Sequence, residues 1–285
     1  MDRLTILCFA GTYSLALASD LARFLTRSRL RWYPTVALTA LGWAVHTAFL
    51  GNLARSRHEL LPVTTVYESL LVLAWVLAAI DLYLLARSPG PTAVGVFILP
   101  LVVALATAAG LSGQRADWVA WGGPVWFWGT VHGVLLLLGA VSTCVATVAG
   151  LMYLVQARRL KHKRPARFGF ALPSLEQSER LNRGAIALAF PLLTSGLLIG
   201  MALIPATRGA GGHALGWTDP KVLSTEALWL VFAALLHARY RPAMRGRRVA
   251  VLTMVAFVFL AFAWVGVGPL LPSDHGAARA GGGPR

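Results

Sequence analysis

Eight separated runs of apolar residues constrain this chain more than any other feature. A helix needs about 20 apolar residues to cross the hydrocarbon core of a membrane, with few charges inside it. The runs cover residues 4–22, 34–54, 66–86, 92–112, 131–156, 184–204, 222–239 and 249–271. Only 13% of the 285 residues are charged, which is low for a soluble domain. The sequence therefore predicts an all-α, polytopic membrane protein: one integral-membrane domain, a bundle of about eight transmembrane helices, with a disordered tail over 276–285.

The basic residues predict how the spans are oriented. Of the 26 Lys and Arg residues, 18 fall in loops on one side of eight alternating spans. The positive-inside rule places that side in the cytoplasm and both termini outside. The cluster over 158–164 is expected to meet anionic lipid headgroups, and no nucleic acid is needed to explain the charge.

The first run lacks a basic n-region and an A-x-A site, so it is predicted to be a true span. Within the loop 157–183, Ser174 and Gln177 predict a capped surface helix.

Tryptophans gather in the outer loop between the fourth and fifth spans. They are Trp118, Trp121, Trp126 and Trp128. A membrane-interface belt accounts for a single tryptophan. Four of them beside Gly122, Gly123 and Pro124 suggest instead a folded amphipathic platform for a flat, apolar ligand.

Histidines give the more specific hypothesis, because neutral imidazole is a common axial ligand of haem iron. His132 at the outer end of span 5 and His275 beyond span 8 lie at matching depth, so they can face one another across a shared site. His46 and His237 lie inside spans, where a polar side chain is expensive and a function or a specific partner is the default reading. For His46 alone, a core hydrogen bond is as good an explanation as a ligand role.

For the acidic residues and cysteines of the spans, the sequence does not select a single role. Glu68, Asp81 and Glu226 are each expected to be paired or to line a polar cavity, and a proton path or a metal site would use the same residue types. Cys8 and Cys144 form no CxxC or CxxCH motif and are predicted to be small buried hydrophobes.

Three segments of the chain resemble the CcsA/ResC-type cytochrome c assembly family, and in particular its HemX-like branch. The first runs from Pro62 through Tyr67 and Glu68 to Trp75 and is similar to the family's P-x-S-N-x-Y-E-S segment. The second joins His132 to a closing G-x-x-Y-L at 150–154. The third contains Trp217, Asp219, Pro220 and Lys221, then Trp229, His237 and His275. Together they cover a region from about 60 to 275, in the family's order.

The resemblance implies non-covalent, b-type haem handled for cytochrome c maturation in the bacterial cytoplasmic membrane. It implies outer ligands at His132 and His275, an intramembrane ligand at His237, and a haem platform that includes Asp219. The implied partners are a CcsB/ResB-type membrane protein, a thioredoxin-like reductant and apocytochrome c. The chain would be a haem-handling assembly factor or a component of a cytochrome c haem lyase.

Two other functions fit the same sequence. Thr218 and Val222 depart from the family's W-D-P-K-E pattern, and the upstream tryptophans sit in the preceding loop. These departures fit a HemX-like membrane regulator of haem biosynthesis, acting through the loop 157–183. A transporter of a cation or small solute would use Glu68, Asp81 and Glu226, although no inverted repeat supports it.

Overall fold

In the computed structural model the described part of the chain consists of helices and short non-helical segments beside them, and contains no strand. The structure describes residues 2–25, 32–57, 62–87, 93–112, 124–163, 172–208, 220–240 and 246–266. The helices are α1 (Asp2–Leu25), α2 (Trp32–Arg57), α3 (Val66–Arg87), α4 (Gly95–Ser112), α5 (Pro124–Lys161), α6 (Leu175–Arg208), α7 (Pro220–Tyr240) and α8 (Arg247–Ala261). A π-helical turn, η2 (Phe262–Gly266), continues α8.

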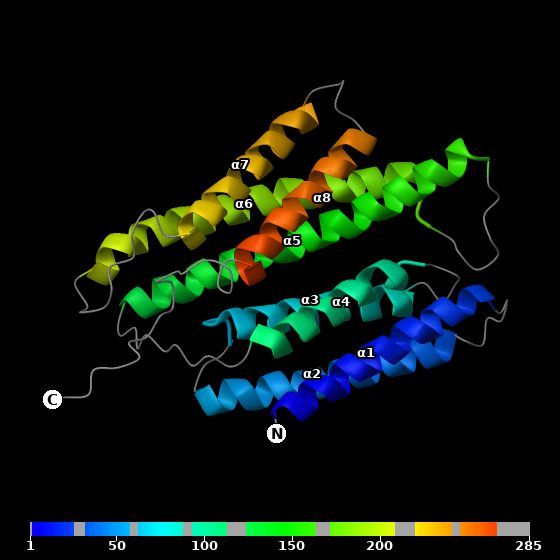
Figure 1. The fold of residues 1–285 in the computed structure, drawn as a ribbon, viewed down its shortest axis with the longest axis horizontal. Coiled ribbons are helices and arrows are strands. Elements are labelled where there is room, and N and C mark those ends of the chain that lie inside the picture. Colours follow the sequence, from blue (N-terminus) through cyan, green and yellow to red (C-terminus); the bar gives the residue numbers. More distant parts are fainter. Residues whose placement is uncertain are drawn as a thin grey trace.

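The helices form two groups of four, which lie one above the other in Figure 1. In the first group α1 packs against α2 and α4, and α3 packs against α2 and α4. In the second group α5 packs against α6 and α8, and α7 packs against the same two helices. The groups meet where α3 and α4 contact α5. The buried apolar side chains of the two groups form one continuous cluster, and α5 contacts helices of both groups.

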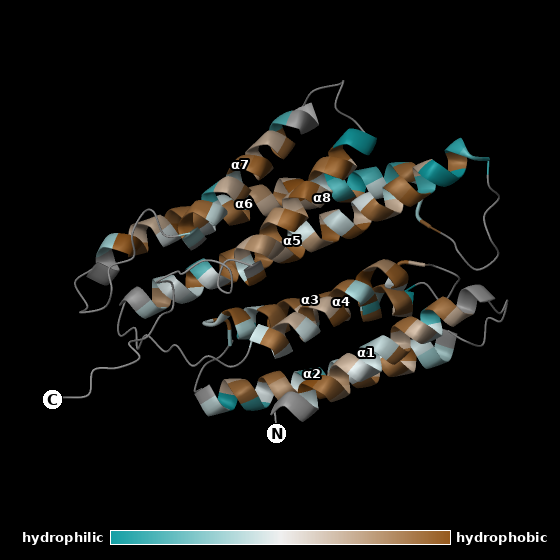
Figure 2. Cartoon of the chain, viewed as in Figure 1, coloured by the Kyte–Doolittle hydropathy of each residue, from teal (hydrophilic) through white to brown (hydrophobic). Residues whose placement is uncertain are grey.

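Composition along the helices agrees with a membrane-spanning bundle. Seven helices are long and apolar enough to cross a membrane, while the apolar part of α7 is the shorter stretch Val222–His237. Large apolar side chains also cover the outside of the bundle, as at Leu111 and Leu230. Figure 2 shows hydrophilic residues gathered at helix ends, most clearly where α5 ends and α8 begins. The predicted all-α, polytopic membrane architecture is confirmed.

Two helices begin several residues before the start that the sequence predicts. α5 begins at Pro124, seven positions before the predicted start at 131, because proline suits the first turn of a helix and no further proline follows within α5. α6 begins at Leu175, so the capped segment in the loop 157–183 is the first turn of α6 and not a separate surface helix. The capping itself is confirmed: Ser174 N donates to Gln177 Oε1 and Gln177 N donates to Ser174 Oγ, each at 3.1 Å.

Polar and aromatic contacts fix neighbouring helices in both groups. Asn182 on α6 donates to the Ala146 carbonyl of α5 at 2.7 Å and to Thr253 Oγ1 of α8 at 3.2 Å, and it is buried. Trp75 of α3 donates to Thr47 Oγ1 of α2 at 2.8 Å.

Of the two cysteines, Cys144 is buried as predicted, whereas Cys8 is exposed on α1, so that prediction is wrong for Cys8.

Candidate functional site

His132 is the predicted haem ligand that the structure describes in most detail. It lies in the third turn of α5 and is half-buried. Its Nδ1 atom is 2.7 Å from the backbone carbonyl oxygen of Gly196 on α6. A carbonyl oxygen only accepts, so Nδ1 carries the proton and the lone pair of the neutral ring is on Nε2. Metal-binding histidines are oriented in this way, with one nitrogen fixed by a carbonyl and the other used as the ligand.

Glycines of α6 make room for the His132 ring. A Cβ atom added at Gly200 would lie 2.7 Å from Cε1 of His132 and 3.0 Å from Nδ1, but 3.6 Å from Nε2. The Nδ1–Cε1 edge of the ring therefore faces α6, and Nε2 lies farther from Gly200. Any larger side chain at this position would push the ring out of its place.

The same kind of contact repeats along the α5–α6 interface. A Cβ atom at Gly196 would lie 2.7 Å from Leu136 Cδ2, and one at Gly139 would lie 2.7 Å from Leu193 Cδ2. Small residues allow helices in a membrane to approach closely. We call the three contacts, His132 on Gly200, Leu136 on Gly196 and Leu193 on Gly139, the glycine sockets. They fix the register of α5 against α6.

The tryptophans of the predicted platform are divided by the structure. Trp126 and Trp128 lie in the first turns of α5, 45% and 48% exposed, with the Phe127 ring 5.5 Å from that of Trp128. They are thus helical residues and not part of a loop, because α5 begins at Pro124 and not at the predicted residue 131. Trp118 and Trp121 lie outside the described residues.

The remaining predicted site residues are described only in part. His275, Trp217 and Asp219 lie outside the described residues. His237 lies in the last turn of α7 and is exposed on the surface of the bundle. Because α5, α6 and α7 alternate in direction, His132 and His237 lie at opposite ends of the second group of helices. The structure therefore does not bring these two histidines together.

His46 lies in the first group of helices and has aromatic neighbours. It is fully buried, its ring stacks on Phe9 with centroids 4.1 Å apart, and its Nδ1 atom is 3.4 Å from Tyr13 Oη. A stacked, hydrogen-bonded position of this kind matches the core role that the sequence left open for His46.

Glu68 has a role that the sequence left unassigned. Its Oε2 atom accepts from Thr64 N at 3.1 Å, Thr64 Oγ1 at 2.7 Å and Thr65 N at 3.1 Å. Thr65 Oγ1 in turn accepts from Glu68 N at 3.2 Å. This is a capping box at the start of α3, and T-x-x-E at 65–68 is its sequence signal. The motif Pro62–Ser69 thus begins a helix with a buried, fully bonded carboxylate oxygen.

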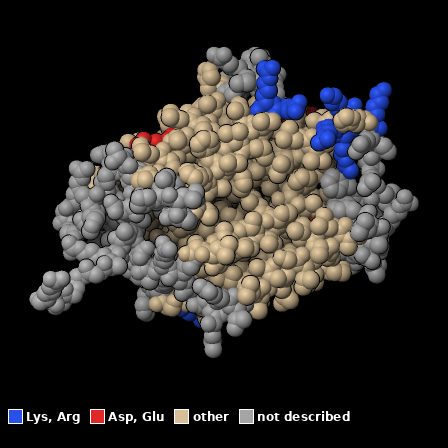
Figure 3. All heavy atoms as spheres, viewed as in Figure 1, with Lys and Arg blue, Asp and Glu red and all other residues tan. Residues whose placement is uncertain are grey.

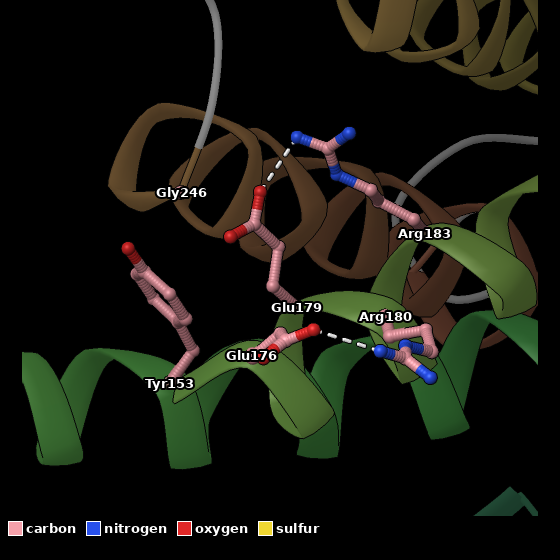
Figure 4. Close-up of a pocket in the computed structure, with 6 residues that line it drawn as sticks. All are labelled: Tyr153, Glu176, Glu179, Arg180, Arg183 and Gly246. Carbon is pink, nitrogen blue, oxygen red and sulfur yellow. Dashed lines mark hydrogen bonds and ion pairs between the residues drawn. The ribbon is translucent and has the colours of Figure 1, made fainter. Parts of the chain in front are cut away.

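A pocket of about 520 Å³ lies at the other end of α5. Figure 4 shows Tyr153 of α5 facing Gly246, with two charged pairs from α6 beside them. Arg180 bonds Glu176 at 2.8 Å and Arg183 bonds Glu179 at 2.6 Å, each one helical turn apart. A Cβ atom at Gly246, whose φ is 62°, would overlap Tyr153 Oη. The two acidic and two basic side chains of the pocket are thus paired within one helix. Figure 3 shows lysines and arginines gathered at this end of the molecule.

The fold and the His132 position define the class: an all-helical, multi-pass membrane protein with an oriented histidine at one end of its longest helix. The chain belongs to the Cytochrome C assembly protein family, whose model matches residues 63–272. The match begins just before α3, so α1 and α2 lie outside it.

Individual relatives agree with this assignment. The chain is 32% identical over 170 residues to the uncharacterized 28.8 kDa protein in the nifR3-like 5′ region of Azospirillum brasilense, covering 60% of this chain and 61% of that protein, which is less than two thirds of its length. It is 29% identical to the cytochrome c biogenesis protein CcsA of Guillardia theta, over 72% of this chain and 73% of that one. It is 27% identical to CcsA of Synechococcus sp. (strain CC9605), over 93% of both chains. No solved structure matches the chain.

Proposed function

We propose that the chain serves cytochrome c maturation by binding haem as a substrate at the outer end of α5 and presenting it to apocytochrome c. Membership of the Cytochrome C assembly protein family supports the pathway. The observation that supports the site is the 2.7 Å hydrogen bond from His132 Nδ1 to the Gly196 carbonyl. It holds the imidazole in the tautomer whose Nε2 can bind iron.

The other groups of the proposed site follow from the family resemblance. His275 is the second outer ligand, and Trp118, Trp121, Trp126, Trp128, Trp217 and Asp219 form the surface on which the haem plane lies. His237, at the other end of the second group of helices, is a separate ligand on the route by which haem enters. Its exposed position on α7 suits a ligand that meets haem at the bundle surface and not in its core.

The chemistry that completes maturation belongs to haem and its acceptor. Each cysteine thiol of a reduced CxxCH adds across a haem vinyl group: sulfur bonds one vinyl carbon and the thiol hydrogen ends on the other. The chain contributes binding, orientation and protection of the iron. The proposed partners are a CcsB/ResB-type membrane protein, a thioredoxin-like reductant that keeps the acceptor thiols reduced, and apocytochrome c. The proposed location is the bacterial cytoplasmic membrane.

Absorption spectroscopy of the full-length protein tests the site. The chain is purified in detergent with and without added haem, and bis-histidine bands are measured in both oxidation states. We expect these bands in the wild type, their weakening in His132→Ala and their loss in the double variant with His275→Ala. Added imidazole should restore part of the signal in His132→Gly, because a free imidazole can occupy the space that the missing ring leaves and act as the ligand.

His162→Ala is the matched control, because His162 is exposed beside the basic end of α5. It should leave the spectrum unchanged. A double variant that folds normally, by its melting temperature, and still shows the wild-type bands would refute the ligand assignment.

A further inference from the structure

The pocket of about 520 Å³ lies near the end of α5 and the starts of α6 and α8. Within the part of the chain that the structure describes, its lining comes from all three: Tyr153 of α5, the two charged pairs of α6, and Gly246 at the N-cap of α8. None of these residues belongs to the basic cluster over 158–164, for which the sequence predicts contact with lipid headgroups. The pocket is therefore a separate candidate site.

Gly246 leaves room for the Tyr153 hydroxyl group. Its φ of 62° lies in the left-handed region that favours glycine. An added Cβ atom would overlap Tyr153 Oη and lie 3.0 Å from Tyr153 Cζ. Figure 4 shows the hydroxyl group pointing toward Gly246. A phenol O–H at this place can donate a hydrogen bond to a ligand in the pocket.

Arg180 and Arg183 have hydrogen-bond donors beyond those that their glutamates use. Each guanidinium bonds its glutamate through Nη2, and a guanidinium has several further N–H groups. The side chains of Arg180 and Glu176 are 78% and 81% exposed, and exposed ion pairs contribute little to stability. An oxyanion can therefore bind these arginines without breaking a strong interaction.

The charge around the pocket favours an anion over a cation. Residues 153–183 contain eight lysines and arginines and two glutamates, and residues 241–248 contain four arginines and no acid. The positive sign therefore does not depend on where each arginine side chain lies. Figure 3 shows the described lysines and arginines gathered at this end of the molecule. A positive field of this kind raises the local concentration of anions.

The position of the pocket along α5 identifies a lipid as the source of the anion. Trp126 and Trp128 are half-exposed at the other end of α5, as is typical of tryptophans at a membrane interface. About 25 residues separate Trp128 from Tyr153, which is about 38 Å of helix. A bilayer has a hydrocarbon core of about 30 Å and a full thickness of about 40–45 Å. With Trp128 at one interface, Tyr153 lies among the headgroups of the opposite leaflet.

We propose that this pocket binds the phosphate group of an anionic membrane lipid. Arg180, Arg183 and the Tyr153 hydroxyl donate hydrogen bonds to the phosphate oxygens. The acyl chains lie against apolar side chains deeper in the membrane, such as Leu188 of α6 and Val251 of α8, which are exposed. The proposal does not rest on the proposed haem function, whose site is at the other end of α5.

The lipid dependence of the melting temperature tests this proposal in the full-length protein. The protein is titrated in an uncharged detergent with phosphatidylglycerol and, separately, with phosphatidylcholine of the same acyl chains. A ligand that binds the folded state raises the melting temperature. We expect a larger rise with phosphatidylglycerol. Equal rises with the two lipids overturn the proposal. An equal rise with inorganic phosphate also overturns it, because the ligand would then be a soluble anion.

Two charge-matched variants test whether the pocket is the site. Arg180→Gln with Arg183→Gln removes both arginines of the pocket and should abolish most of the added effect of phosphatidylglycerol. Lys161→Gln with Lys163→Gln removes two charges at the exposed end of α5, outside the lining, and should keep most of that effect. Equal losses in the two double variants would indicate a general attraction between this end and anionic lipids, and would overturn the proposal.

An uncharged change keeps the test decisive if the arginine variant fails to fold. Tyr153→Phe removes one donor and no charge, so the phosphatidylglycerol concentration that gives half of the effect should rise about tenfold. Tyr83→Phe is the control, because Tyr83 is an exposed tyrosine of α3 in the other group of helices. It should leave that concentration unchanged, and equal values for the two variants overturn the assignment of the pocket.

Discussion

The orientation of His132 depends on a residue that has no side chain. Gly200 accepts the Nδ1–Cε1 edge of the imidazole, and Gly196 supplies the carbonyl that fixes its tautomer. The hydrogen bond joins residues 64 positions apart in the sequence. The resemblance to the family identified His132 from its own segment. Nothing in that segment indicates which turn of α6 lies opposite, so the two glycines could not be predicted.

Replacing Gly200 by alanine tests this dependence. The added methyl group would lie 2.7 Å from His132 Cε1, so the ring must turn or α6 must shift. Alanine gains about 1 kcal/mol of helix propensity over glycine, whereas overpacking of this kind costs about 1–3 kcal/mol. We expect Gly200→Ala to melt at a lower temperature and to bind haem more weakly in a spectroscopic titration.

The control for Gly200→Ala lies on the same helix. A Cβ atom at Gly184 has nothing within 4 Å, so Gly184→Ala should gain helix propensity without a clash and melt at the same or a higher temperature. Equal melting temperatures for the two variants would mean that the contact between His132 and position 200 does not limit stability.

At the level of single helices, the sequence predicts well which stretch of the chain forms each helix, and less well at which residue the helix begins or ends. All eight predicted runs fall within observed helices over most of their length, because a membrane span is determined by local apolar composition. The errors occur where polar or aromatic residues continue a helix beyond the apolar run. α5 takes in Trp126 and Trp128 at its start, and α6 takes in the charged turn from Leu175.

Helix capping gives a prediction of its own. Glu68 accepts from two backbone N–H groups and a hydroxyl at the start of α3, and it is fully buried. Loss of a cap costs about 0.5–2 kcal/mol, and a buried donor left without its acceptor adds to that cost. We expect Glu68→Ala to lower the melting temperature clearly, as measured by circular dichroism.

The control for Glu68→Ala is Gln177→Ala, because Gln177 has the same position in the cap of α6 as Glu68 has in the cap of α3. Gln177 bonds Ser174 in the same pattern, but it is exposed, so water can replace it. Gln177→Ala should therefore change stability less than Glu68→Ala. The reverse order would show that the buried bonds of Glu68 contribute little to the stability of α3.

At the level of the whole molecule, the two groups of four helices differ in how they are held together. Contacts within each group are extensive, whereas among the described helices the groups meet mainly where α3 and α4 contact α5. This arrangement could not be predicted from apolar runs, which give the number of spans but not their neighbours. The separate placement of His132 and His237 follows from helix direction, and could be predicted once the spans were counted.

Dividing the chain between α4 and α5 tests the independence of the two groups. When residues 1–113 and 114–285 are co-expressed, we expect the pieces to co-purify in a mild detergent through the α3–α5 contact. In a harsher detergent they should separate on size exclusion while each keeps its helical circular dichroism. Loss of helix at the moment of separation would indicate one cooperative core.

The glycine sockets have a consequence for the depth of the proposed site. His132, Leu136 and Leu193 are each seated in a position of the facing helix that only glycine provides. Sliding α5 by one turn, about 5.4 Å, would bring either His132 to Gly196 or Leu136 to Gly200, because these glycines are four residues apart. It would also move Gly139 away from Leu193 and set the remaining side chain against a larger neighbour. The position of His132 along α6 is thus set by these contacts and not by the lengths of the connecting segments, so a change in those lengths should leave the imidazole opposite Gly200.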